Sequence, residues 1–106
     1  MKKSKLFLSG PMSGYPEWNH PTFHEAAATL RALGFKVFNP AESYNGDTTR
    51  PRSDYMRVCL EALLKCDGLV SLPRWSSSEG AYIERKAAEQ IGLPVWNLAS
   101  FLKEHS

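Results

Sequence analysis

The chain of 106 residues is 42% hydrophobic and 23% charged, which excludes wholesale disorder and fits a single domain over residues 1–106. Thirteen basic and eleven acidic residues leave a net charge of +2. A protein that binds nucleic acid through its charge needs many Lys and Arg side chains on one face, so direct nucleic-acid binding is not expected.

The N-terminus and the cysteines bear on location. Residues 1–5 are rich in Lys, like the start of a signal peptide, but the apolar run after them covers only residues 6–8 and stops at Ser9-Gly10-Pro11. No run approaches the length of a membrane span. Cys59 and Cys66 lie seven positions apart in one predicted helix, too far apart for a disulfide. We therefore expect a cytoplasmic protein with reduced thiols and no membrane partner.

In chain order, short apolar runs alternate with longer amphipathic segments. The short runs predict strands at residues 6–8, 35–38, 68–72 and 94–96. Spacings of three and four between apolar residues predict helices at residues 22–33, 53–65, 76–91 and 99–104, and residues 41–52 are expected to form a loop. Ser53 is the expected cap of the second helix, and Ser76 with Glu79 has the spacing of a capping box at the third.

This alternation of strands and helices predicts an α/β fold. Each connection crosses over the sheet, so the strands run parallel and helices cover both faces. We expect a small open doubly wound sheet of four strands, flavodoxin-like, in the order 2-1-3-4. Ligand sites in such sheets lie beyond the carboxyl ends of the strands. That rule selects the loops at residues 9–20, 39–52 and 73–80.

The loop after the first predicted strand reads Ser9, Gly10, Pro11, Met12, Ser13, Gly14. Its small residues let backbone N–H groups approach an anion or a sugar closely, although a plain sharp turn has the same composition. The spacing matches neither a Walker loop nor the GxGxxG motif. The rings of Tyr15, Trp18 and His20 follow, and they would stack on a base or equally cover the edge of the sheet.

The third predicted helix places a carboxylate on an apolar face. Positions 81, 84, 88 and 91 step by three and four, so Glu84 shares a face with Ala81, Ala88 and Ile91. A lone carboxylate on such a face is costly unless it is paired or lines a cavity. Two interpretations stay open: a Glu bonded to a backbone N–H or an Arg, and a catalytic carboxylate at the mouth of the sheet.

The histidines and cysteines do not indicate a metal centre. Neither His20 nor His24 has partners at metal-ligand spacing, and Cys59 and Cys66 belong to no metal-spaced cluster. We therefore expect no metal site.

Three segments stand in a specific order along the chain: residues 6–12 (LFLSGPM), residues 66–70 (CDGLV), and residues 78–84 (SEGAYIE) followed by residues 92–95 (GLPV). Together they resemble the nucleoside 2-deoxyribosyltransferase superfamily, which includes the 2'-deoxynucleoside 5'-monophosphate N-glycohydrolases. The resemblance spans nearly the whole chain. Within the superfamily, the chain is most similar to a small branch of unknown function that is common in phages and prophages.

The resemblance implies cleavage of the N-glycosidic bond, or deoxyribosyl transfer, on a deoxynucleoside or its 5'-monophosphate, with no cofactor. Glu84 matches the nucleophile of those enzymes, a Glu that attacks the anomeric carbon. Ser78, with Gly80 and the N–H groups beside it, matches the Ser that binds the 5'-phosphate in the monophosphate hydrolases. The first loop, from Ser9 to Gly14, would form the sugar side of the site.

Three positions depart from the pattern of that superfamily. Cys59 stands where its members have an Asp that helps to protonate or position the base, and a thiol cannot act as a carboxylic acid. Ser13 stands in place of an Arg in the first loop, and Phe7 in place of a Tyr in the first strand. An alternative function therefore stays open: a non-catalytic module that binds or sequesters a nucleotide on the same fold. A third is a structural or interaction protein.

Self-association is also expected, as a homodimer. A sheet of four short strands in a chain of this size leaves apolar surface uncovered at its edges. The rings expected at the interface are Trp75, Tyr82, Trp96 and Phe101. The resemblance favours dimers or larger assemblies as well.

Overall fold

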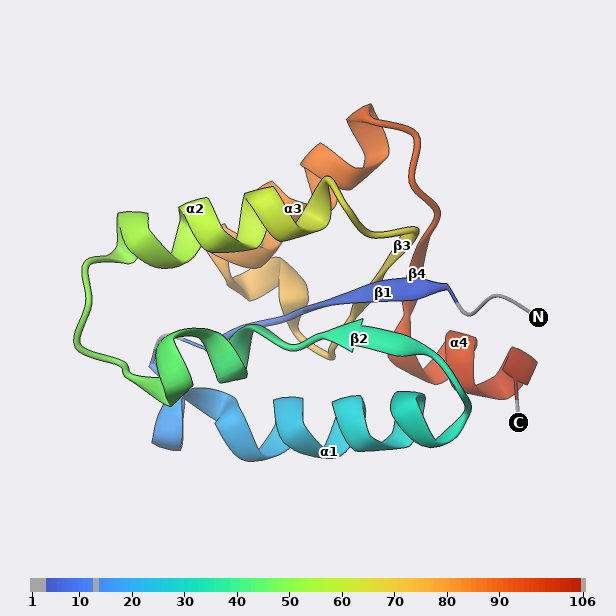
Figure 1. The fold of residues 1–106 in the computed structure, drawn as a ribbon, viewed down its shortest axis with the longest axis horizontal. Helices are drawn as coiled ribbons and strands as arrows, with labels where there is room; N and C mark the ends of the chain where they lie inside the picture. Colours follow the sequence, from blue (N-terminus) through green and yellow to red (C-terminus); the bar gives the residue numbers. More distant parts are fainter. Residues whose placement is uncertain (1–3, 13, 106) are drawn as a thin grey trace.

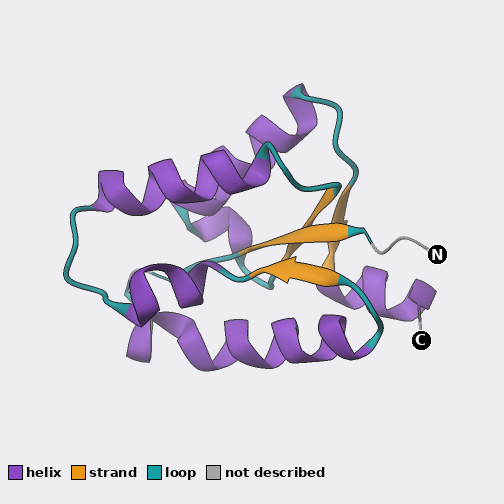
Figure 2. Ribbon diagram, viewed as in Figure 1, coloured by secondary structure: helices purple, strands orange, loops and turns teal. Residues whose placement is uncertain are grey.

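Four parallel strands form one sheet in the order β2-β1-β3-β4 (Figure 2). The structure is a computed structural model that describes residues 4–12 and 14–105. Its strands are β1 (Lys5–Ser9), β2 (Lys36–Phe38), β3 (Gly68–Ser71) and β4 (Val95–Asn97). The predicted α/β class and the predicted strand order are both confirmed.

Helices cover both faces of the sheet. The longer ones are α1 (His20–Ala32), α2 (Arg52–Leu63), α3 (Glu79–Gln90) and α4 (Leu98–His105), and short 3-10 helices form η1 (Pro16–Asn19), η2 (Pro40–Gly46) and η3 (Trp75–Ser77). α1 and α4 lie on one face, and α2 and α3 on the other (Figure 1). Within the described residues, no helix combines the length and the apolar character needed to cross a membrane.

Alternation along β1 divides the core into two clusters. Leu6 and Leu8 point to the face covered by α1 and α4, whereas Phe7 points to the face covered by α2 and α3. The first cluster is completed by Phe23, Ala26, Ala27, Leu30, Val37, Ala41, Val70, Leu72 and Phe101, and the second by Cys59, Leu63, Cys66, Leu69 and Ala88. β1 is therefore a central strand that is buried on both sides, as its continuous apolar run predicts.

Two helix starts differ from the sequence expectation. α2 begins at Arg52 with Pro51 at its cap position, so Ser53 lies inside the helix; the fixed φ of proline suits a helix start. α3 is capped by Ser78, whose Oγ accepts the N–H of Ala81 at 3.3 Å. Ser76 instead lies in η3, so its predicted capping role is wrong. The expected loop over residues 41–52 contains most of η2.

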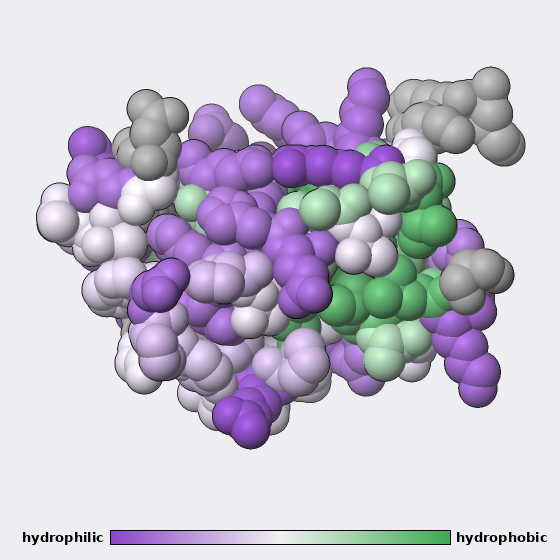
Figure 3. All heavy atoms as spheres, turned by 90° about the horizontal axis from the view of Figure 1, so that it is seen from below, coloured by the Kyte–Doolittle hydropathy of each residue, from purple (hydrophilic) through white to green (hydrophobic). Residues whose placement is uncertain are grey.

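Hydrophobic residues reach the surface at one end of the face that α1 and α4 cover (Figure 3). Phe35, Leu98 and Leu102 are half-buried there against the first core cluster. Phe101 itself is 1% exposed and packs against the rings of Phe35 and Trp96. The expectation that Phe101 lies at an interface is therefore wrong, because its ring is buried in the core.

Candidate active site

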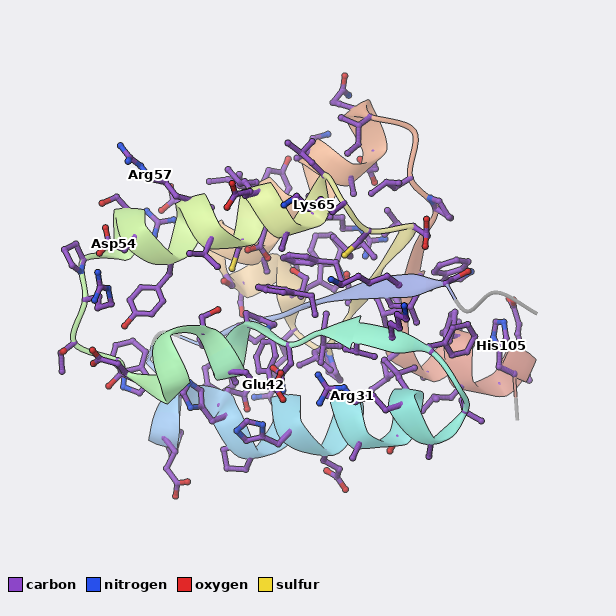
Figure 4. The ribbon with its side chains drawn as sticks, in the orientation of Figure 1. Arg31, Glu42, Asp54, Arg57, Lys65 and His105 are labelled. Carbon is purple, nitrogen blue, oxygen red and sulfur yellow. The ribbon has the colours of Figure 1, made fainter. Side chains whose placement is uncertain are left out.

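A cleft of about 270 Å³ lies beyond the carboxyl ends of the strands, where the loops after β1, β2 and β3 meet. This is the end of the molecule where α2 begins, near Asp54 in Figure 4, and opposite the end that carries His105. All three selected loops contribute to its lining, and so do α2 and α3. The lining includes Gly10, Met12, Trp18, His20, Asp47, Arg50, Arg52, Ser78 and Gly80 from the loops, and Tyr55, Cys59, Ala81 and Glu84 from the two helices.

Glu84 lies on the buried face of α3 and lines this cleft. Its neighbours on that face, Ala81 and Ala88, are small, so the helix approaches the sheet closely and Glu84 is only 7% exposed. The Ser9 hydroxyl, at the carboxyl end of β1, donates a hydrogen bond of 2.7 Å to Glu84 Oε1. Ile91, expected on the same face, is exposed instead because it lies just beyond the end of the helix.

Burial raises the pKa of the Glu84 carboxyl group from an ordinary 4.5 to about 7. Hydrogen bonds from the Ser9 hydroxyl and the Cys59 thiol favour the carboxylate and act in the opposite direction. None of the ion pairs in the described part of the chain includes Glu84. Of the two interpretations of this residue, pairing with an Arg is thus not what the structure shows. The carboxyl group takes both protonation states near neutral pH, a property typical of functional sites.

Cys59 lies on α2 beside Glu84, at 6% exposure, and also lines the cleft. Burial and the negative charge of Glu84 both raise the pKa of the Cys59 thiol. The group therefore stays an S–H under ordinary conditions and is a poor nucleophile. Its contribution here is a hydrogen bond to the neighbouring carboxyl group.

The structure brings only part of the expected first loop into the cleft. Gly10 and Met12 line it, and Ser9 lies beneath it in contact with Glu84. Pro11 is not among the lining residues: its side chain is buried, and its carbonyl oxygen accepts a hydrogen bond from Asn19 Nδ2 at 2.8 Å. Gly14 is not among them either, and it is exposed in a left-handed turn at φ 84° with open space around it. Ser13 lies outside the described residues.

Glycine is required at position 10 for a steric reason. A Cβ on Gly10 would lie 2.7 Å from Leu72 Cβ, closer than real Cβ contacts come. The first loop therefore packs directly on the chain that follows β3. This close approach fixes one wall of the cleft.

The start of α3 gives the cleft a second polar region. Ser78, as cap residue, and Gly80 both line the cleft at the first turn of the helix, where the Ser78 Oγ already accepts the N–H of Ala81. Arg50 and Arg52 also line it, and Arg52 forms an ion pair of 3.4 Å with Glu79. The sequence analysis did not single out these two arginines, although they flank Pro51 in a loop that it selected.

Metal-ligating groups do not gather in the described residues. Within residues 4–12 and 14–105, no three His, Cys, Asp or Glu side chains lie together so that they would hold a metal ion.

With this geometry in place, comparison with known proteins adds a family and a fold. The family model described as "Domain of unknown function (DUF4406)" matches residues 4–97. The chain belongs to this family. No curated protein matches the chain. Among solved structures, this DUF4406 domain is similar to a 2-deoxyribosyltransferase from the psychrotolerant bacterium Bacillus psychrosaccharolyticus, with a TM-score of 0.72 and 23% identity. The match covers 89% of this chain and 71% of the other, and it shows a shared fold.

Replacing Glu84 by Gln should stabilise this DUF4406 domain in a pH-dependent manner. Because the folded-state pKa of Glu84 is raised to about 7 from 4.5, the folded state holds a proton that the unfolded state releases, and stability falls as the pH rises through this window. Gln carries no such charge. We expect Glu84→Gln to raise the free energy of unfolding at pH 8 by up to about 3 kcal/mol, and much less at pH 4.5. Urea unfolding at both pH values measures this.

The matched control is Glu89→Gln, which neutralises a half-exposed carboxylate on the outer side of the same helix. This variant should lack the pH-dependent gain. A gain for Glu84→Gln that is equal at pH 4.5 and pH 8 would contradict the account of the buried carboxyl group.

Proposed function

We propose that this DUF4406 domain cleaves the N-glycosidic bond of a deoxynucleoside or its 5'-monophosphate, or transfers the deoxyribosyl group, with Glu84 as nucleophile. The observation that carries this proposal is a nearly buried carboxyl group that lines an open cleft and is oriented by Ser9 rather than neutralised by a cation. The two free cysteines are consistent with action in the cytoplasm.

The geometry suits attack by a carboxylate on a sugar. Ionised Glu84 would approach C1' from the floor of the cleft, and its negative charge stabilises the oxocarbenium-like transition state. The Ser9 hydroxyl holds one carboxylate oxygen, Oε1, and so orients the carboxylate for attack. The covalent deoxyribosyl ester that results would then pass to water or to a second base.

The N-terminus of α3 supports recognition of a 5'-phosphate. Its free N–H groups and the positive end of its helix dipole attract an anion, and the Ser78 hydroxyl and the Gly80 backbone lie at the same point of the cleft. Arg52 also lines this region, where it forms its ion pair with Glu79. A nucleoside monophosphate would place its phosphate here and its sugar above Glu84.

Cys59 favours a second candidate, a nucleotide-binding module without turnover. Its protonated thiol supplies no carboxylic acid beside the reacting carbon. A domain of this kind would bind the same nucleotides in the same cleft but release no base. Detection of free base therefore distinguishes the two candidates.

Turnover should depend on Glu84. We expect Glu84→Gln to release free base at least about a hundredfold more slowly than the parent chain, because the amide cannot attack C1'. The assay incubates each protein with a panel of deoxynucleosides and their monophosphates and quantifies free base by chromatography. Retained binding of the nucleotide by the variant shows that the cleft is intact. Base release by the variant at the parental rate would overturn the role of Glu84.

We also propose that the chain forms a homodimer through α3. Three large hydrophobic side chains on or just beyond this helix are exposed: Tyr82, Ile83 and Ile91. Light scattering at micromolar concentration should give about twice the chain mass of 11.9 kDa, and Ile83→Glu should return the mass to that of one chain. A parent protein with the mass of a single chain would rule the dimer out.

A further inference from the structure

We propose that His20 is the residue that protonates the departing base, a role that rests on the proposed function. When Glu84 attacks C1', the electron pair of the C1'–N bond moves onto the base, which leaves as an unstable anion unless it receives a proton. The Cys59 thiol is a poor donor for this purpose. His20 lines the same cleft as Glu84 and carries a group that donates protons near neutral pH.

A strained segment of backbone presents His20 to the cleft. Glu17, Trp18 and Asn19, the three residues directly before it, all adopt left-handed conformations, with φ of 53°, 54° and 62°. This conformation is strained for residues with a Cβ, and such strain gathers at functional sites. Asn19 holds the segment through its 2.8 Å hydrogen bond to the Pro11 carbonyl oxygen. As a result, Trp18 and His20 both line the cleft, with the indole 42% exposed and available to stack on a base.

A chain of contacts from the core positions the His20 ring. Asn39 lies just after β2 and is 1% exposed. Its Oδ1 accepts the N–H of Ala41 at 3.0 Å. Its Nδ2 therefore faces His24 and donates to Nδ1 of that ring at 3.2 Å. In the neutral His24 ring the proton is then on Nε2. This ring packs edge-on against the His20 ring, with centroids 6.0 Å apart. The buried Asn39 side chain thus orients His24, and His24 in turn packs against His20 at the edge of the cleft.

The groups around His20 set its protonation. Burial and His24 lower the pKa of His20 from 6.5, and Glu17 raises it. Glu42 of η2 lines a shallow depression together with His20 and His24. Its carboxylate is held by Arg31 through two hydrogen bonds of 3.0 Å, a pair labelled in Figure 4.

Charges on the cleft wall complete the surroundings of His20. Asp47, Arg50 and Arg52 line the same cavity from the loop after η2 and the start of α2. A hydrogen bond to Thr49 is the main reason that the pKa of Asp47 is lowered. This wall therefore holds a carboxylate and two guanidinium groups, whereas His20 supplies an imidazole whose pKa is lowered from 6.5.

Glu84 forms a bond to C1' as the C1'–N bond breaks, and the His20 imidazolium gives its proton to a base nitrogen, so a neutral base leaves. Water then attacks C1' and passes a proton to the now neutral His20 imidazole. The electron pair of the ester C1'–O bond returns to Glu84 as the carboxylate.

A pair of substrates tests this role. One is a purine deoxynucleoside monophosphate; the other is its N7-methylated counterpart, whose positively charged base leaves without a proton. We expect His20→Gln to lower kcat/KM about a hundredfold on the unmodified purine and less than about threefold on the methylated one. The control is His105→Gln, at the far end of the molecule (Figure 4), which should match the parent on both substrates.

The pH profile gives a second readout. On the unmodified purine, the parent rate should fall above pH 7, where the ionisation of Glu84 is complete and no longer offsets the continuing loss of the His20 imidazolium. The residual rate of His20→Gln should instead rise through pH 7 as Glu84 ionises. Equal losses on both substrates, or no loss on either, would overturn the role of His20 while leaving the proposed function intact. Failure of the parent to cleave either substrate would overturn the proposed function instead.

Discussion

The molecule depends on one buried carboxyl group, that of Glu84, whose hydrogen-bond donors carry no charge. Glu84 lies at the carboxyl ends of the strands, and its contacts are the Ser9 hydroxyl and the Cys59 thiol rather than a cation. Such a group costs stability when it ionises. Glu84 therefore destabilises the fold near neutral pH, and the proposed function gives that cost a purpose.

The surrounding architecture follows from this placement. Small residues on α3, Ala81 and Ala88, let the helix lie close to the sheet, and Gly10 lets the first loop pack directly on the chain after β3. These close approaches put the Glu84 carboxyl group, a helix N-terminus and an aromatic wall around one cavity. Strain in the backbone before His20 indicates that the wall, like Glu84, is maintained at some cost to stability.

The fold class was predictable from the sequence, because apolar runs and spacings of three and four are local signals, and their alternation predicts a parallel sheet; the expected strand order was also correct. Glu84 stood out for the same reason, as a carboxylate on a small-residue face. The hydrogen bond from Ser9 was not predictable, since it joins residues 75 positions apart and depends on how α3 docks on β1. The left-handed turn before His20 was missed too, because its residues are not glycines. Arg52 was missed because only the folded loop brings it to the cleft.

Trapping the covalent intermediate tests the central claim most directly. The probe is a nucleotide whose arabino-configured sugar carries fluorine at C2'. The fluorine destabilises the oxocarbenium-like transition states and so slows both the formation and the hydrolysis of the ester. If the base of the probe is a good leaving group, formation outpaces hydrolysis and the ester accumulates. Mass spectrometry of the treated protein should show one added fluorosugar phosphate group, located on the peptide that contains Glu84, and none on Glu84→Gln. Release of the base with no adduct, or with the adduct on another residue, would contradict the account.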